Sequence, residues 1–204
     1  FQDCTSLKEV QYLTSSCKYG TGSSNYSTNV FAGCTALEKV VLSDGITYLP
    51  DRFFSGCSAL KTVQVYNSTD KTVSGNENEV LLPDAITHIG ISCFNGCSSV
   101  TSITLPSSLT SVGSDAFLAF ADIEIVIPAG VTEIDDNAFC GHTVSVEDGN
   151  TAYFAQDGML FSSDGTVLSA PAGMTGTDGS MIVPEEVVKI GSYALNQVTG
   201  IKEI

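Results

Sequence analysis

The sequence predicts a repeat solenoid: a right-handed coil with short parallel β-strands, few or no long helices, and one β-ribbon insertion. Three observations predict it. A phenylalanine-led line recurs along the chain, a second line containing Pro and Gly recurs between its copies, and both alternate apolar with polar residues as short strands do. Because one such unit cannot bury its apolar side alone, stacked copies must share a core.

The phenylalanine-led line sets the period of the repeat. It begins FAGCTALEKVVL, FSGCSALKTVQV or FNGCSSVTSITL in its strongest copies, and its five copies start at Phe1, Phe31, Phe54, Phe94 and Phe117. Two of the intervals are 23 residues, and the other two are 30 and 40 residues with their surplus in polar stretches. We therefore expect loop insertions at about 15–27 and 67–79 that leave the repeat register intact.

The second line completes the unit. It reads LPDAITHIGISCF at 82–94 and LPSSLTSVGSDAF at 105–117, with further copies at 42–54, 127–139 and 183–195. One unit is therefore a strand, a Pro or Gly turn, a second short strand, and a turn that returns to the phenylalanine.

Residues 143–170 interrupt this rhythm. Asp157-Gly158 and Asp164-Gly165 flank a short apolar run, and Asp-Gly in that setting is a strong hairpin signal. We expect a β-ribbon insertion there, after which the repeat resumes. The chain, 1–204, is then a single solenoid, which we expect to be a fragment of a longer array because a bare coil end exposes a pairing edge.

The composition is strongly acidic. Eight Lys and Arg stand against 23 Asp and Glu, giving a formal net charge of −15. Such a surface repels phosphate backbones and anionic lipid headgroups, so we expect no nucleic-acid partner. No run of 18 apolar residues is present, so we expect no membrane insertion. Basic proteins, cations and neutral glycans remain open as partners, and we expect a monomer.

The repeat resembles a known family. The pattern F-x-G-C-[ST]-x-L-x-x-[VI]-x-[LI]-P-x-x-[VI]-T-x-I-G-x-x-A-F is similar to the BspA-like leucine-rich repeat, and covers nearly the whole chain. The interruption shares that likeness through Asn150, Tyr153, Asp157-Gly158, Leu160 and Phe161. Ala119-Phe120 and Asn196-Gln197 depart from it by replacing Gly-Cys. The resemblance implies a leucine-rich-repeat coil in a bacterial protein that is secreted or on the cell surface and adheres to host proteins or other cells.

The cysteines and histidines are the residues that could carry chemistry. Four cysteines share one repeat position, and we interpret them as a column of small, buried, free thiols: Cys4, Cys34, Cys57 and Cys97. Zinc is disfavoured, because Cys93 has a close partner only in Cys97. His88 lies at a variable strand position and His142 in a turn, and neither belongs to a nucleophile motif. We expect no catalytic activity and no cofactor.

Calcium is the alternative that the acidic turns keep open. Asp135-Asp136-Asn137 and Glu147-Asp148-Gly149-Asn150 could supply oxygen ligands. No D-x-[DN]-x-[DN]-G loop is present, however, and acidic turn residues more often cap turns. The sequence therefore assigns no metal ligand, and a calcium-stabilised repeat stays a lesser alternative.

Strand residues that face away from the predicted core form a polar ladder, which is either a solvated face or a binding face. They are Glu9, Gln11, Lys39, Val41, Thr62, Gln64, Ser102, Thr104, Glu124 and Val126. Some six strands roughly 4.8 Å apart give a footprint on the order of 300–400 Å², against about 800 Å² per partner in a standard interface. We therefore expect insertions or further repeats to contribute, with Tyr153 and Phe154 as loop contacts and Phe161 in the core.

Two functions are consistent with this pattern. One is a non-enzymatic extracellular adhesion or recognition module for a host or neighbouring-cell protein or glycan. The other is a structural spacer within a larger surface protein. Binding assays on variants of the strand face and of the loops separate the two.

Overall fold

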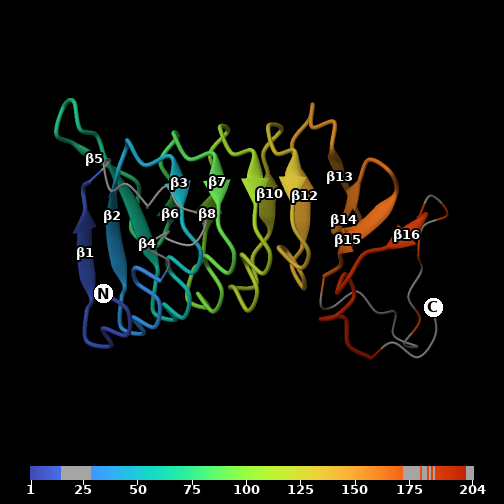
Figure 1. Ribbon diagram of the computed structural model, residues 1–204, viewed down its shortest axis with the longest axis horizontal. Coiled ribbons are helices and arrows are strands. Elements are labelled where there is room, and N and C mark those ends of the chain that lie inside the picture. The colour runs from blue at the N-terminus through green and yellow to red at the C-terminus, as the bar shows by residue number, and fades with distance from the viewer. Residues whose placement is uncertain (15–28, 172–179, 181–182, 184, 186, 201–204) are drawn as a thin grey trace, which may run out of the picture.

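The chain forms a long stack of short strands, seen end to end in Figure 1. The computed structural model describes residues 1–14, 29–171, 180, 183, 185 and 187–200. Within these residues the regular secondary structure consists of β-strands, without a helix, and almost all strand pairings along the stack are parallel. The predicted leucine-rich-repeat solenoid is therefore confirmed. The insertion expected at 15–27 lies outside the described residues.

Two sheets line the stack. The first sheet runs β1 (Glu9–Tyr12), β2 (Lys39–Ser43), β4 (Thr62–Tyr66), β6 (Val80–Leu81) and β8 (Ile103–Thr104), and along the same side β10 (Ile125–Ile127) pairs with β12 (Val144–Val146). The second sheet runs β3 (Tyr48–Leu49), β7 (His88–Ile89), β9 (Ser111–Val112) and β11 (Glu133–Ile134). Val40 lies opposite Val63 and Ile89 opposite Val112, so equal repeat positions are side by side.

The first sheet contains one strand more than the repeat count requires. Between Phe54 and Phe94 the chain passes through this sheet twice, as β4 and as β6, whereas β3 pairs directly with β7 in the second sheet. The short strand β5 (Val73–Ser74) also folds back antiparallel on β4. The insertion at 67–79 is thus not a free loop, because it supplies β5 and leads into an added strand.

The phenylalanine column is the centre of the core. The rings of Phe31, Phe54, Phe94, Phe117 and Phe139 are at most 1% exposed. Consecutive ring centroids in this column are 5.2–5.9 Å apart, including the Phe54–Phe94 pair across the long interval. Each buried ring contributes about 1.5–3 kcal/mol through the hydrophobic effect. The column explains why the insertion at 67–79 preserves the register.

The cysteine column forms a ladder of thiol hydrogen bonds. The Sγ of Cys34 donates to the Phe1 carbonyl oxygen at 3.0 Å, that of Cys57 to Phe31 at 3.1 Å, and that of Cys97 to Phe54 at 3.2 Å. The six described cysteines are free, as predicted, and Cys34, Cys57 and Cys97 are buried. Cys4 is exposed, so its predicted burial is wrong, and Cys17 lies outside the described residues. Burial raises the pKa of the Cys57 thiol to about 12, so this column is neutral and structural.

The β-ribbon is confirmed. Strand β13 (Tyr153–Gln156) pairs antiparallel with β14 (Met159–Ser162) across Asp157 and Gly158, which both have positive φ angles as a type I′ turn requires. Strand β15 (Thr166–Ser169) follows antiparallel, and β16 (Lys189–Ile190) pairs parallel with it. The interruption begins later than the predicted residue 143, because β12 continues the first sheet in register with β10.

The ribbon joins two hydrophobic clusters. Leu160 packs in the large cluster that fills the solenoid, whereas Met159 and Phe161 pack in a small second cluster with Val167, Ala170 and Ala194. This division follows from the strand geometry, since neighbouring side chains in β14 point to opposite faces. Phe161 is 2% exposed, so its predicted place in the core is confirmed.

Candidate binding surfaces

The outward face of the first sheet is only partly accessible. Six of the ten ladder residues are exposed: Glu9, Gln11, Ser102, Thr104, Glu124 and Val126. Lys39 and Gln64 are partly covered. Val41 and Thr62 are only 4% and 3% exposed, so their assignment to an open binding face is wrong.

The insertion at 67–79 covers Thr62 and binds two of its neighbours in the ladder, Gln64 and Lys39. The backbone N–H of Asn78 donates to Thr62 Oγ1 at 3.0 Å, and Gln64 Nε2 donates to the Gly75 carbonyl oxygen at 3.0 Å. Lys39 Nζ forms an ion pair with Glu77 at 2.6 Å, and this bond raises the pKa of Lys39. Outward side chains of the sheet therefore anchor the insertion instead of meeting a partner.

The covering segment also reaches the next coil. Thr101 Oγ1 donates to the Asn78 carbonyl oxygen at 2.8 Å, which ties the insertion to the turn before β8. The exposed part of the face is consequently divided. Glu9 and Gln11 lie at one end, and the patch formed by Ser102, Thr104, Glu124 and Val126 lies beyond the insertion. We call this second set the β8–β10 patch.

Strand β6 was not part of the predicted ladder. Leu81 lies opposite Thr104 in the register and belongs to the same outward row. The signal was present in the sequence, because Leu82-Pro83 opens the second repeat line just as Leu105-Pro106 does after strand β8. A strand before each such Leu-Pro would have placed β6 correctly.

Tyr153 and Asn150 dock the ribbon onto the solenoid. The Tyr153 hydroxyl accepts a hydrogen bond from the backbone N–H of Ile134 at 2.9 Å, and burial raises the pKa of this phenol. Asn150 Nδ2 donates to the carbonyl oxygens of Pro128 and Val131, and its Oδ1 accepts from two backbone N–H groups. Tyr153 therefore satisfies the edge of β11, and its role is to hold the ribbon.

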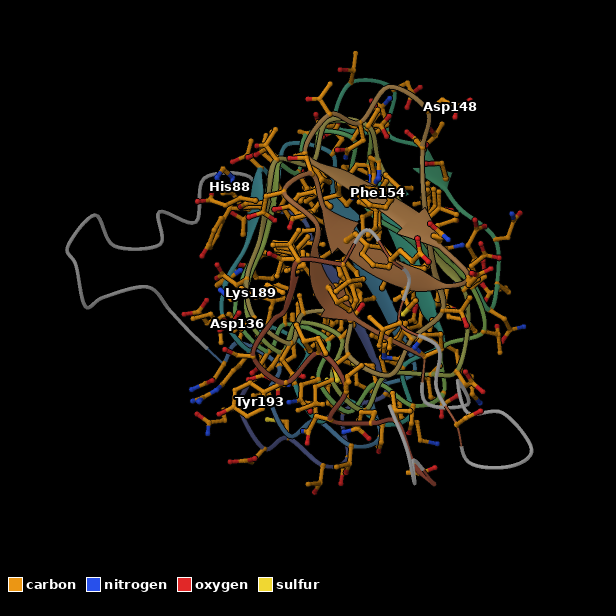
Figure 2. The ribbon with its side chains drawn as sticks, turned by 90° about the vertical axis from the view of Figure 1, so that its right-hand side faces the viewer. His88, Asp136, Asp148, Phe154, Lys189 and Tyr193 are labelled. Atoms are coloured by element: carbon orange, nitrogen blue, oxygen red, sulfur yellow. The ribbon has the colours of Figure 1, made fainter. Side chains whose placement is uncertain are left out.

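Phe154 is the more accessible of the two predicted loop contacts. Its ring is 39% exposed and stacks on Phe161 with centroids 4.9 Å apart. The end view in Figure 2 places Phe154 on the ribbon that closes this end of the stack. Phe154 is therefore held by its stacking on Phe161 and is still accessible to a partner, whereas Tyr153 is engaged with the solenoid.

The side chains of the acidic turn at 147–150 hydrogen-bond to the backbone of the preceding coil. Glu147 Oε2 accepts from the backbone N–H of Ala129 at 3.0 Å, and Asn150 is fully engaged as described above. Within the described residues, no three His, Cys, Asp or Glu side chains gather in an arrangement that could hold a metal ion.

His142 occupies the cysteine column. In the line Phe139-Cys140-Gly141-His142 it stands where other copies have cysteine, and its Nε2 lies 2.7 Å from the Phe117 carbonyl oxygen. This contact is the counterpart of the thiol bonds from Cys57 and Cys97. Burial is the main effect on this imidazole, and it lowers the pKa of His142 below its usual value. The spacing F-x-G-H carried this signal in the sequence.

The reactive side chains are thus committed to packing. The thiols of Cys93 and Cys97 have pKa values raised by burial, and His142 is only 5% exposed. His88 is exposed on β7, with its Nδ1 2.6 Å from Thr87 Oγ1. The Thr87 hydroxyl therefore has an imidazole beside it, but it also donates to the Thr47 carbonyl oxygen at 3.2 Å, so this hydroxyl ties neighbouring coils together. In the described ranges, no helix is long and apolar enough to cross a membrane.

The stacked sheets and shared columns define the molecule as a leucine-rich-repeat solenoid. The family model described as BspA type leucine rich repeat region matches residues 1–76 and 72–147, with six copies. The chain belongs to this family. No curated protein sequence matches it.

Solved structures of bacterial proteins are similar in fold. A leucine rich cell surface protein from Faecalibacterium prausnitzii is 25% identical, with a TM-score of 0.59 over 82% of this chain and 48% of that one. The pneumococcal vaccine antigen PcpA is 21% identical, with a TM-score of 0.64 over 96% and 49%. A leucine-rich repeat protein from Bacteroides ovatus is 21% identical, with a TM-score of 0.56 over 97% and 51%. The chain spans about half the length of these structures.

Proposed function

We propose that this chain is a non-catalytic recognition module that acts outside the cell or at its surface, where it binds a protein or glycan of a host or neighbouring cell. The observation that carries the proposal is the β8–β10 patch. Its side chains are exposed on a rigid sheet, whereas the inward columns are used up in packing. The similarity to a bacterial cell surface protein supports the location. The acidic charge supports partners other than nucleic acid.

Three surfaces compete for the partner, and one variant tests each. Thr104→Glu combined with Val126→Glu alters the β8–β10 patch, Val73→Glu alters the insertion, and Phe154→Ser alters the ribbon. Each altered side chain is exposed, so folding should be preserved. Ser98→Glu adds one negative charge at an exposed turn, as each of the three glutamate substitutions does, and is the control.

The assay measures binding to immobilised extracellular matrix proteins and glycans, with melting temperatures recorded in parallel. We expect the double variant to weaken the binding of matrix proteins about tenfold or more while Ser98→Glu binds them like the wild type. Loss of binding only in Val73→Glu or Phe154→Ser would move the site to that surface. A chain that binds nothing in the panel would favour a spacer, for which the continuous stack is also suited.

A further inference from the structure

One position of the repeat holds every described copy in a left-handed backbone conformation. The residue two before the column phenylalanine or leucine has a positive φ angle in six copies: Asn29, Arg52, Ser92, Asp115, Asn137 and Tyr193. Asn and Asp tolerate this conformation, but a tyrosine rarely adopts it. Tyr193, at φ 61°, is therefore a costly choice at this position, and its ring is 64% exposed. Packing does not explain the tyrosine.

The turn holds Tyr193 rigidly in spite of this conformation. Its carbonyl oxygen accepts hydrogen bonds from the Cys140 thiol at 3.2 Å and from the Asn196 backbone N–H at 2.9 Å. Ala194, the next residue, is buried, and its carbonyl oxygen accepts from the backbone N–H of Ala170 at 3.0 Å. The exposed ring thus stands on a backbone that is fixed on both sides.

A cleft opens beside this ring. Its volume is about 400 Å³, and it is lined by Ser114, Asp115, Asp136, Asn137, Tyr193 and Asn196. In the end view of Figure 2, Asp136 and Tyr193 lie on the same side of the molecule. Three consecutive coils contribute to it, because Asp115, Asn137 and Tyr193 are successive members of the left-handed column. We call it the Tyr193 cleft.

The polar groups of the cleft are partly prepared for a ligand. Asn137 is only 8% exposed, and its Nδ2 donates to Asp115 Oδ1, whereas its Oδ1 is buried without a hydrogen-bond partner. Such an oxygen costs about 1–3 kcal/mol unless a donor reaches it. Asn29 Oδ1 shares this state, so the oxygen alone is a property of the column. The Tyr193 ring and the exposed Asp136 carboxylate distinguish this site.

We infer that the Tyr193 cleft binds a neutral sugar residue of a glycan, which deepens the proposed recognition role and rests on it. A sugar ring presents C–H groups on one face, which pack on an aromatic ring, and hydroxyls at its edge, which both donate and accept. Tyr193 offers the ring, the two carboxylates accept, and the amides of Asn137 and Asn196 do both. The carboxylates and the net charge of −15 disfavour sialylated or sulfated sugars.

Three variants of Tyr193 separate binding from stability. Tyr193→Ala removes the ring, and we expect affinity to fall about tenfold or more. Tyr193→Phe keeps the ring and should retain binding within a few-fold. Tyr193→Asn also removes the ring but suits the left-handed backbone, so it should melt no lower than the wild type while binding as weakly as Tyr193→Ala. Phe1→Ala, which removes an exposed ring at the other end of the stack, is the control.

The probes are immobilised neutral oligosaccharides ending in mannose, galactose or N-acetylglucosamine, and a sialylated glycan as counter-probe. We expect the chain to bind at least one neutral probe. The affinity should not change between about 0.05 and 0.5 M salt, a range over which attraction between exposed charges is screened. A chelator should not change it either. A steep fall of affinity with salt, or equal binding by wild type and Tyr193→Asn, would overturn the cleft assignment.

The outcome distinguishes this inference from the broader proposal. Neutral glycan binding lost in the Thr104→Glu/Val126→Glu variant but kept in Tyr193→Asn overturns the cleft and leaves the recognition role intact. Binding of matrix proteins without any glycan does the same. Binding of nothing overturns both.

Discussion

At the scale of single residues, the repeat keeps one side-chain hydrogen bond even where the residue that makes it changes from cysteine to histidine. Cys34, Cys57 and Cys97 each place a donor against the carbonyl oxygen of the phenylalanine one coil away, and His142 does the same with a ring nitrogen. The cysteine column and the histidine therefore share one physical task. Each of these carbonyl oxygens also accepts a backbone N–H, so the side-chain donor adds a second hydrogen bond, which contributes about 0.5–1.5 kcal/mol.

The histidine differs from cysteine in its response to acid. Burial lowers the pKa of His142 below the ordinary value of 6.5, and the Phe117 contact and the Asp122 charge oppose this only in part. The unfolded chain consequently binds the proton more tightly than the folded chain. The stability that His142 contributes is present above about pH 6.5 and is lost as the pH falls from there towards the lower folded pKa.

His142→Cys tests this linkage. The thiol restores the residue found elsewhere in the column and keeps a donor, but it stays neutral in acid. We expect the free energy of unfolding of the wild type to fall more than that of His142→Cys between pH 7.5 and 5, measured by urea denaturation. Carboxylates such as Asp44 and Asp164, whose pKa values are lowered by hydrogen bonds, act equally in both proteins. Identical pH profiles would mean that His142 carries no linkage.

At the scale of elements, the phenylalanine column links coils that the insertions separate in sequence. Phe94 stacks between Phe54 and Phe117, with ring centroids 5.4 and 5.5 Å away. Phe1 belongs to the same column. It stacks on Phe31, and it is 67% exposed. The column thus offers a fully buried phenylalanine, Phe94, and a mostly exposed one, Phe1, for comparison.

Phe94→Ala should lower the free energy of unfolding by about 3–5 kcal/mol, because it removes a fully buried ring and leaves a cavity. Phe1→Ala is the matched control and should cost less than about 1 kcal/mol. Denaturant titration monitored by circular dichroism measures both. Equal losses in the two variants would show that the column is not the source of coil-to-coil stability.

The sequence predicted the elements whose signals are local or periodic. The strands followed from alternation, the phenylalanine column from the repeat spacing, and the hairpin at Asp157-Gly158 from its demand for positive φ angles. The fate of Val41 and Thr62 could not be predicted in this way. Thr62 is covered by Asn78, 16 residues further along the chain, and neither period nor composition says where an insertion folds back. The left-handed column that carries Tyr193 likewise became visible only in the backbone angles.

At the scale of the whole molecule, stability is distributed along one axis. In a solenoid each coil contacts only its neighbours, so separate stretches can open separately. The large hydrophobic cluster extends from Phe31 to Val144 and includes Leu160, whereas the small cluster contains Met159, Phe161, Val167, Ala170 and Ala194. The described part of the chain therefore has two cores of unequal size that meet in β14.

Phe161→Ala tests whether these cores unfold separately. We expect the variant to lose hydrogen-exchange protection in residues 153–170 and 187–200, by about 3–5 kcal/mol of local opening free energy. Residues 31–134 should keep the protection of the wild type, because the phenylalanine column does not depend on the small cluster. Phe154→Ala removes the partly exposed partner ring and should open the same segment less.

The alternative result has an equally definite meaning. Loss of protection along the whole chain in Phe161→Ala would show that β14 couples the two cores into one cooperative unit. The Tyr193 turn lies on the small cluster through Ala194, so in that case the proposed sugar cleft would share the stability of the entire solenoid. With separate cores, opening of residues 153–170 and 187–200 would abolish the cleft while the β8–β10 patch stays folded, and the two surfaces could be lost one at a time.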